Sequence, residues 1–365
     1  MKNRNRNHTP WREKPERTVG LDLGDRFSSY CILQAQGEVI EEGRIPTTEK
    51  GLRKQFANSP RLRIALECGT HSPWVSRLLE QLGHQVIVAN AREVHSITHS
   101  VSKSDPHDAE QLARLAHSDP RLLKPIQHRS PERQQDLNLL RARHTLVRAR
   151  TLVVNSLRGL VKSAGGRLPK CSTESFPQRA AAHLPASIAS LAAPLLEQVA
   201  SFNTHIAALD QQIEALAQRD PAIALLRTAP GVGPLVAAAY VLTLDRHDSV
   251  AHSRQVGARL GLRPKQHQSG DGDPQRGITK ISNRYLRTLL VQSAHYVLGP
   301  FGPDSALRRW GLKLAGTGNQ GAKKRAVVAV ARKLAVLLHA MWRTGQCYQP
   351  FPPSARARAV PNRNP

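Results

Sequence analysis

The sequence predicts an α/β sheet domain followed by a mainly helical region, and three observations support this prediction. Short apolar runs alternate with helical patterns over residues 18–100, as in a mixed sheet with helices packed on it. A long basic helix starts at Pro131, and short, closely spaced apolar helices follow Asp220. The expected segments are a basic tail without regular structure (1–17), the sheet domain (18–125), a helical coiled-coil linker (126–218), a helical domain (219–347) and a second tail (348–365).

The charge of the chain predicts a polyanionic partner. Lys and Arg number 53 against 27 Asp and Glu, a formal net charge of +26. Nucleic acid is the usual partner of such a chain because phosphate neutralisation releases counterions; an anionic membrane surface is the alternative. No apolar run is long enough to span a bilayer, so we expect no membrane insertion.

Three further features of composition narrow the setting. The N-terminus lacks the apolar core of a signal peptide. The four cysteines are scattered without the spacing of a zinc site or a disulfide framework, which favours a reducing, cytoplasmic compartment. Aromatic residues make up only 4% of the chain, which argues against base stacking as the main mode of binding.

The sheet domain begins with antiparallel strands and continues with crossovers. The segments "TVGLDLG" and "RFSSYCILQAQ" predict a strand pair, and "GEVIEEGRIPT" adds a third strand after the turn at Gly37. A short helix in "GLRKQFAN" precedes the buried strand "LRIALECG". The helix "HSPWVSRLLEQLG" and the strand "HQVIVAN" complete a mixed α/β sheet.

Two long helices make up the linker. The first, from Pro131 to about Ala164, carries an apolar stripe at three- and four-residue spacing. Between Arg141 and Lys170 it has eight Lys or Arg and no Asp or Glu, whereas a solvated helix face normally mixes both signs. The second helix, "LAAPLLEQVASFNTHIAALDQQIEALAQR", predicts an antiparallel coiled coil with the first, which is also a plausible dimerisation element.

The helical domain opens with a glycine-containing turn between two helices, in "AIALLRTAPGVGPLVAAAYVLTL". Gly231 and Gly233 allow a tight turn whose backbone N–H groups can hold a phosphate at the start of the next helix. This pattern resembles a helix-hairpin-helix motif, and a plain helix–helix connector is the alternative. A Gly/Asp/Ser-rich loop, a helix bearing Arg284 and Arg287, and the basic helix "GAKKRAVVAVARKLAVLLHAMW" follow.

Two aspartates stand three residues apart at the start of a helix, in "KSDPHDAEQLARL". Asp105 and Asp108 therefore share a helix face, where like charges repel unless a helix N-terminus or a metal holds them. Capping is one explanation, with Ser104 or Asp105 as the N-cap and Pro106 at the first helical position. Metal binding is the other.

Two more acids lie in otherwise apolar strands. Asp22 in "VGLDLGD" is flanked at a distance of two residues by Gly20 and Gly24, which leaves room for a close approach. Glu67 ends the strand in "RIALECGT". A charged side chain in a core strand is costly unless it is paired or binds metal. Together with the helical pair, these carboxylates would suit two Mg²⁺ ions that activate the attacking oxygen and stabilise the leaving one in phosphodiester chemistry.

The order of these acids resembles that of a known family. The motifs "GLDLGD", "ALECGT" and "KSDPHDAEQLA" are similar to those of the RNase H-like, RuvC-like nuclease domain of the DEDD transposases of the insertion-sequence 110 family. The segments "LLRTAPGVGPLVAAAYVLTL", "LGLRPKQHQSG", "GITKISNRYLRTLL" and "KKRAVVAVARKLAVLLHAM" resemble its second, transposase-specific domain. The resemblance spans roughly residues 18 to 345.

The resemblance implies a recombinase that excises and inserts its own mobile element in a bacterial, nucleoid-associated setting. It implies Mg²⁺ at Asp22, Glu67, Asp105 and Asp108, an element-encoded guide ("bridge") RNA that pairs with donor and target DNA, and a serine nucleophile that forms a phosphoserine link to DNA. Ser269 in "QHQSGDG" is the best match to that serine. Two acids follow it where the family has none, and Ser282 in "TKISNRYLR" replaces a usual glycine, so Ser282 is the rival nucleophile.

The chain is further expected to contact double-stranded DNA, RNA and a second copy of itself as a dimer or tetramer. The nucleic-acid contacts are expected at Arg141, Arg143, Arg148, Arg150, Arg158, Lys162, Gly231, Gly233, Lys265, Arg276, Lys280, Arg284, Arg287, Lys323, Lys324 and Arg325. Two other functional classes stay open. One is a structure-selective endonuclease, or junction resolvase, that uses the carboxylates with water; the other is a non-enzymatic nucleic-acid-binding protein in which the acids are caps.

Overall fold

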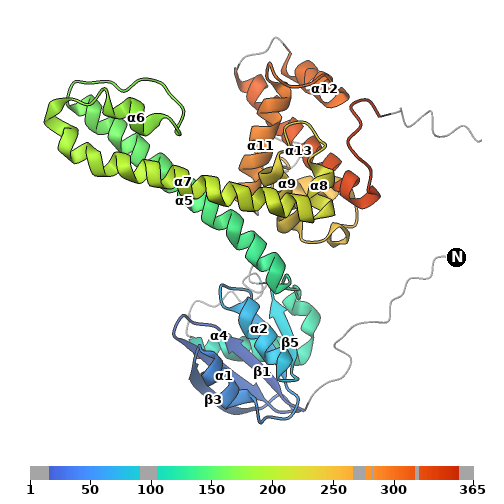
Figure 1. The fold of residues 1–365 in the computed structure, drawn as a ribbon. Coiled ribbons are helices and arrows are strands. Elements are labelled where there is room, and N and C mark those ends of the chain that lie inside the picture. Colours follow the sequence, from blue (N-terminus) through green and yellow to red (C-terminus); the bar gives the residue numbers. More distant parts are fainter. Residues whose placement is uncertain (1–15, 91–104, 266–276, 281–282, 317–319, 353–365) are drawn as a thin grey trace, which may run out of the picture. The chain divides into compact units, whose positions relative to one another are not determined.

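The computed structural model describes residues 16–90, 105–265, 277–280, 283–316 and 320–352, with the backbone but not the side chain of Asp105. The chain divides into two compact units, Met1–Arg129 and Ser130–Pro365 (Figure 1). The first unit is α/β and the second is helical, as the sequence predicts. None of the helices described is both long and apolar enough to cross a bilayer.

The first unit is built on a mixed five-stranded sheet of order β3-β2-β1-β4-β5. β1 pairs antiparallel with β2 and parallel with β4, while β2–β3 is antiparallel and β4–β5 parallel. The antiparallel strands come first in the chain and the crossovers second, so the predicted order of elements is confirmed. The bounds are β1 Thr18–Asp22, β2 Phe27–Leu33, β3 Val39–Pro46, α1 Glu49–Phe56, β4 Arg63–Glu67, α2 Ser72–Gln81, β5 Gln85–Ala89, α4 Asp105–Ser118 and a 3₁₀ turn Pro120–Leu123.

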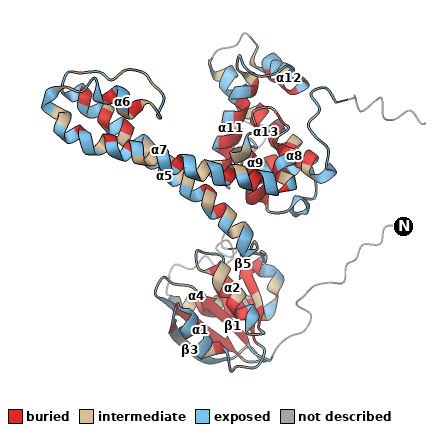
Figure 2. Ribbon diagram, in the orientation of Figure 1, coloured by how far each residue is buried: buried red, intermediate tan, exposed pale blue. Residues whose placement is uncertain are grey.

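Helices cover both faces of this sheet. α1 and α2 pack on one face through a cluster that includes Leu21, Leu66 and Val75. α4 packs on the other face, where Ala109 and Ala113 meet the buried side chains of β2, and Leu112 and Ala116 meet those of β4 and β5. The strands that lie between these two layers are therefore largely buried in Figure 2, and a polar side chain at their ends is conspicuous.

The second unit consists of a helical hairpin and a compact helical bundle. Its helices are α5 Pro131–Ser163, α6 Phe176–Ala181, α7 Ala189–Arg219, α8 Pro221–Leu226, α9 Pro234–Leu244, α10 Val256–Arg259, α11 Arg284–Leu298, α12 Ala306–Ala315 and α13 Gln320–Thr344, with 3₁₀ turns at Ala186–Ile188, His247–Ser249 and Ser253–Gln255. The main core joins α9, α11 and α13 to the ends of α5 and α7. A smaller cluster ties α6 to the far end of the hairpin.

α5 and α7 run antiparallel, as three polar contacts between them show. Arg219 pairs with Asp136 at 2.5 Å, Arg143 with Asp210 at 2.6 Å, and Arg150 Nη1 donates to Asn203 Oδ1 at 2.8 Å. Successive partners advance along one helix as they retreat along the other. α5 starts cleanly because Ser130 Oγ accepts the Arg133 N–H and Pro131 occupies the first turn.

Candidate active site

Asp22 and Glu67 close two neighbouring parallel strands. The register of β1 and β4 runs from Thr18 beside Arg63 to Leu21 beside Leu66, so its next step places Asp22 beside Glu67. Parallel strands lie about 4.8 Å apart, which makes the two acids neighbours at the carboxyl edge of the sheet. Both residues are half-buried.

Both acids belong to the α4 face of the sheet. Side chains alternate along a strand, so Asp22 shares the face of Gly20 and Glu67 that of Ala65. Gly20 meets the backbone of α4, and Ala65 packs in the cluster that α4 covers. The third and fourth predicted acids are on the helix that lies over this face.

The first turn of α4 lies at the level of Asp22, because α4 runs antiparallel to β1. Thr18 Oγ1 is 3.5 Å from His117 Nδ1 near the end of α4, and Gly20 is level with Ala109. Asp22 is two residues, or about 6.6 Å, beyond Gly20 along β1. The same distance along α4 is roughly four residues, so Asp22 lies level with the residues that precede Ala109 at the start of α4. Asp108 lies in that first turn and is half-buried.

The topology therefore brings all four predicted acidic positions to one end of the sheet. Asp105 opens α4, and its side chain lies outside the part that is described. Among the described side chains, no three from His, Cys, Asp and Glu converge closely enough to hold a metal ion. The donors at this edge are carboxylate oxygens, the ligands that Mg²⁺ prefers, so the donor chemistry fits Mg²⁺ while the metal site itself stays a prediction.

Gly20 sets how closely α4 approaches the sheet, which leads to a first testable prediction. A Cβ at residue 20 would lie 1.9 Å from the Ala109 carbonyl oxygen and 2.5 Å from the Ala113 nitrogen, both backbone atoms that cannot turn aside. We expect Gly20→Ala to lower the free energy of unfolding by about 3 kcal/mol or more, beyond the usual cost of overpacking. Thermal unfolding followed by circular dichroism measures this.

Gly69 supplies the matched control for that substitution. It lies in the same unit, and apart from Gly69 and its chain neighbours no atom of the described residues lies within 4 Å of the Cβ that Gly69→Ala would add. We expect that variant to unfold at nearly the wild-type temperature. If Gly20→Ala is as stable as Gly69→Ala, α4 does not lie against β1 in the way described.

The sequence reasoning missed His71, which lies close to the same edge. It follows β4 in "ECGTHSPW" and precedes α2. Its Nδ1 accepts the indole N–H of Trp74 at 3.2 Å, so Nε2, 3.8 Å from an Asp25 carboxylate oxygen, carries the proton of the neutral ring. The position of His71 just after a buried strand was the signal in the sequence, because loops at the carboxyl ends of parallel strands often hold functional side chains.

The two candidate serines, Ser269 and Ser282, lie outside the described residues, as does Arg276. The described residues on either side of 266–276 pair with each other: Pro264 forms an antiparallel bridge with Ile278, and the Lys265 N–H donates to the Gly277 carbonyl at 3.0 Å. Asn283 then caps α11 by accepting the Leu286 N–H at 3.1 Å.

The predicted basic contacts divide into exposed and internally bonded side chains. The exposed set is Arg141, Arg148, Lys162, Lys265, Lys280, Arg284, Lys323, Lys324 and Arg325. Arg143 and Arg150 bond to residues of α7, Arg158 lies over the Phe176 ring at 5.5 Å, and Arg287 is buried and donates to the Leu260 carbonyl at 3.1 Å. The internally bonded arginines also stabilise the second unit, and in the exposed set Arg141 donates to Asn138 Oδ1 at 3.5 Å.

Gly231 and Gly233 lie in the turn between α8 and α9. Gly231 has a positive φ of 73°, and a Cβ there would lie 3.0 Å from the Ser293 carbonyl oxygen, so the turn packs flush against α11. Gly233 is the N-cap residue of α9 and has no side chain to cap it.

The chain matches two transposase family models and several known transposases. Residues 19–165 match the family model of the IS110 DEDD transposases, and residues 223–306 match the one described as "Transposase IS116/IS110/IS902 family". A "Probable family 20 transposase" of Pseudomonas aeruginosa is 30% identical over 341 residues, which cover 91% of this chain and 98% of that protein. The transposase for insertion sequence element IS1111A of Coxiella burnetii is 25% identical over 352 residues, 92% of each chain. The chain belongs to the IS110 family of insertion-sequence transposases.

Proposed function

We propose that this transposase excises and inserts the DNA of its element with carboxylates of an RNase H-like, RuvC-like first unit and a serine of the second. One observation carries the proposal: the strand register and the course of α4 bring Asp22, Glu67 and the first turn of α4 to one edge of the sheet. Four acidic positions at one end of the sheet, in a chain of net charge +26, suit metal binding, and the positive charge of the chain suits a polyanionic substrate.

The carboxylates have the role of metal ligands in this proposal. Two Mg²⁺ ions held by Asp22, Glu67, Asp105 and Asp108 would neutralise charge at the scissile phosphate and increase the acidity of a bound hydroxyl. Asp105 and Asp108 sit in the first turn of α4, where the positive end of the helix dipole offsets part of their mutual repulsion.

The serine forms the covalent link to DNA in this proposal. Ser269 Oγ attacks phosphorus, and the Oγ–P bond forms as the bond from phosphorus to the leaving deoxyribose oxygen breaks. The serine gives up its proton, and the leaving oxygen takes one. One phosphodiester replaces another, so the link conserves the bond energy for the later attack of a DNA hydroxyl. Lys265, four residues before Ser269 in the sequence, would offset the charge of the phosphorane.

The partners in this proposal are the donor and target DNA duplexes, a guide RNA and further copies of the chain. The exposed cations of α5 and α13 include Arg148 and Lys323, and such side chains suit contacts with the phosphate backbone. Sequence would then be read by base pairing with the guide RNA rather than by protein side chains.

A covalent-adduct assay tests the proposal. Full-length protein, guide RNA and end-labelled DNA are incubated with Mg²⁺ and separated under denaturing conditions. We expect a labelled protein–DNA band that disappears when EDTA removes Mg²⁺ and returns when Mg²⁺ is restored. Mg²⁺-dependent nicking without an adduct would instead support the resolvase alternative, and binding with neither product would support a non-enzymatic protein.

A further inference from the structure

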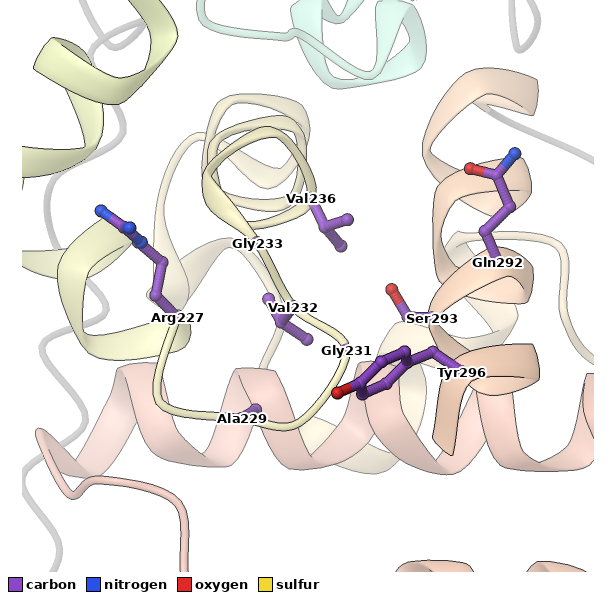
Figure 3. A pocket seen from close by; sticks show the side chains of 9 residues that line it. All are labelled: Arg227, Ala229, Gly231, Val232, Gly233, Val236, Gln292, Ser293 and Tyr296. Atoms are coloured by element: carbon purple, nitrogen blue, oxygen red, sulfur yellow. The ribbon is translucent and has the colours of Figure 1, made fainter. Parts of the chain in front are cut away.

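A surface cavity of about 450 Å³, largely open to solvent, lies between the turn before α9 and the surface of α11 (Figure 3). Its size falls in the range of small-ligand pockets. Val232 and Gly233 line it from the turn, Val236 from α9, and Ser293 and Tyr296 from α11. All of these residues belong to the second unit, so the cavity is formed within a single folded body.

The walls of the cavity combine an exposed aromatic ring with apolar side chains. Tyr296 is 47% exposed, whereas Val232, another lining residue, is buried. The turn lies close to one edge of the Tyr296 ring, because a Cβ at Gly231 would approach Tyr296 Cδ1 to 3.0 Å. A solvent-facing aromatic ring is a surface on which a planar ligand can stack.

The polar groups at the cavity suit different parts of a nucleotide. Ser293 Oγ points into the cavity in Figure 3, and its hydroxyl donates to the Leu289 carbonyl at 3.2 Å, so its remaining lone pairs suit an N–H donor on the edge of a base. The backbone N–H groups at the start of α9 have no side-chain cap. Among the described residues that line the cavity, Arg227 is the one cation, it pairs with Glu214 at 2.7 Å, and none is a carboxylate.

We propose that this cavity receives the base of one unpaired nucleotide, which stacks on Tyr296 while its phosphate lies near the first turn of α9. A duplex keeps its bases stacked on each other and offers none to such a pocket, so the site favours single-stranded nucleic acid over duplex. This inference rests on the proposed binding of nucleic acid. It adds that Tyr296 contacts a base and that the nucleic acid bound there is single-stranded.

Photocrosslinking of the full-length wild-type protein tests the contact directly. The probe is a single-stranded DNA of mixed sequence in which 5-iodouracil replaces thymine, irradiated in its complex with the protein. Peptide mass spectrometry then locates the cross-links. We expect Tyr296 among the cross-linked residues. Cross-links confined to residues outside the cavity would overturn the inference.

Affinity measurements on variants test the energetics. We expect Tyr296→Ala to weaken binding of that single strand about 5- to 150-fold, as for the loss of one stacked base, and to leave the salt dependence unchanged because the ring carries no charge. Tyr296→Phe keeps the ring and should restore binding. Phe301→Ala removes an aromatic side chain that is 83% exposed and lies outside the cavity, and should bind as the wild type.

The same measurements separate this inference from the proposed function. If Tyr296→Ala weakens duplex and single strand equally, or Tyr296→Phe loses as much affinity as Tyr296→Ala, base stacking in the cavity is wrong. If the wild type recombines DNA and Tyr296→Ala binds single strands unchanged, the inference fails alone. A wild type that binds no nucleic acid would overturn both.

Discussion

Asp22→Asn is expected to reduce strand transfer and adduct formation at least about 100-fold while nucleic-acid affinity stays close to that of the wild type. The amide is nearly the same size as the carboxylate, but it loses the charge that Mg²⁺ requires, and even partners of metal ligands contribute 10- to 100-fold to activity. Binding is retained because the expected phosphate contacts come from basic side chains elsewhere. The adduct band and a filter-binding affinity, measured on one preparation, check both halves.

Asp25→Asn is the matched control for that experiment. It makes the same chemical change three residues later, at an aspartate whose side chain is 94% exposed and 3.8 Å from His71. We expect its activity to stay near that of the wild type, because Asp25 lies beyond the end of β1. Full activity in Asp22→Asn, or an equal loss in both variants, would contradict a specific role for Asp22 as a ligand.

Ser269→Ala is expected to abolish the covalent protein–DNA adduct altogether. Without the hydroxyl, no phosphoserine link can form, whereas metal-dependent nicking by water at the carboxylates can continue. We therefore expect the adduct band to vanish and a residual Mg²⁺-dependent nick to remain. Denaturing electrophoresis of labelled DNA separates the two products.

Ser282→Ala decides between the two candidate serines. If the adduct persists in Ser269→Ala and is lost in Ser282→Ala, the nucleophile is Ser282, just before the N-cap of α11. Loss of the adduct in both variants with wild-type binding would assign the chemistry to one serine and a supporting role to the other. Mass spectrometry of the wild-type adduct peptide then identifies the attached residue.

The sequence predicted the fold of the first unit well because its signals are local. Alternating apolar runs predict strands, and the change from a tight turn at Gly37 to helical crossovers predicts the change from antiparallel to parallel pairing. The glycine before Asp22 indicated a close approach but not its partner. That partner, Ala109, is distant in sequence and is reached only through the packing of α4.

The partners of the basic side chains on α5 could not be predicted from local sequence. The segment from Arg141 to Lys170 holds no acid, which predicted a uniformly basic surface. In the structure, Arg143 is held by Asp210 from α7, and Arg150 bonds to Asn203. These pairs depend on the antiparallel register of two helices, which no window of sequence contains. The cavity at Tyr296 was missed for the same reason, because its walls come from α9 and α11.

The two aspartates in the first turn of α4 stabilise the helix without a metal, so the folding of α4 does not depend on metal binding. Each acid at a helix N-terminus is worth about 0.3–1 kcal/mol to the helix whether or not a metal is present. Capping and metal binding, the two explanations of "KSDPHDAEQLARL", are therefore compatible. The aspartates would stabilise the helix in the metal-free protein and hold the ions in the metal-bound protein. On the proposed mechanism, α4 can therefore fold before any metal is bound. Metal binding, rather than a folding event, then completes the site that cuts DNA.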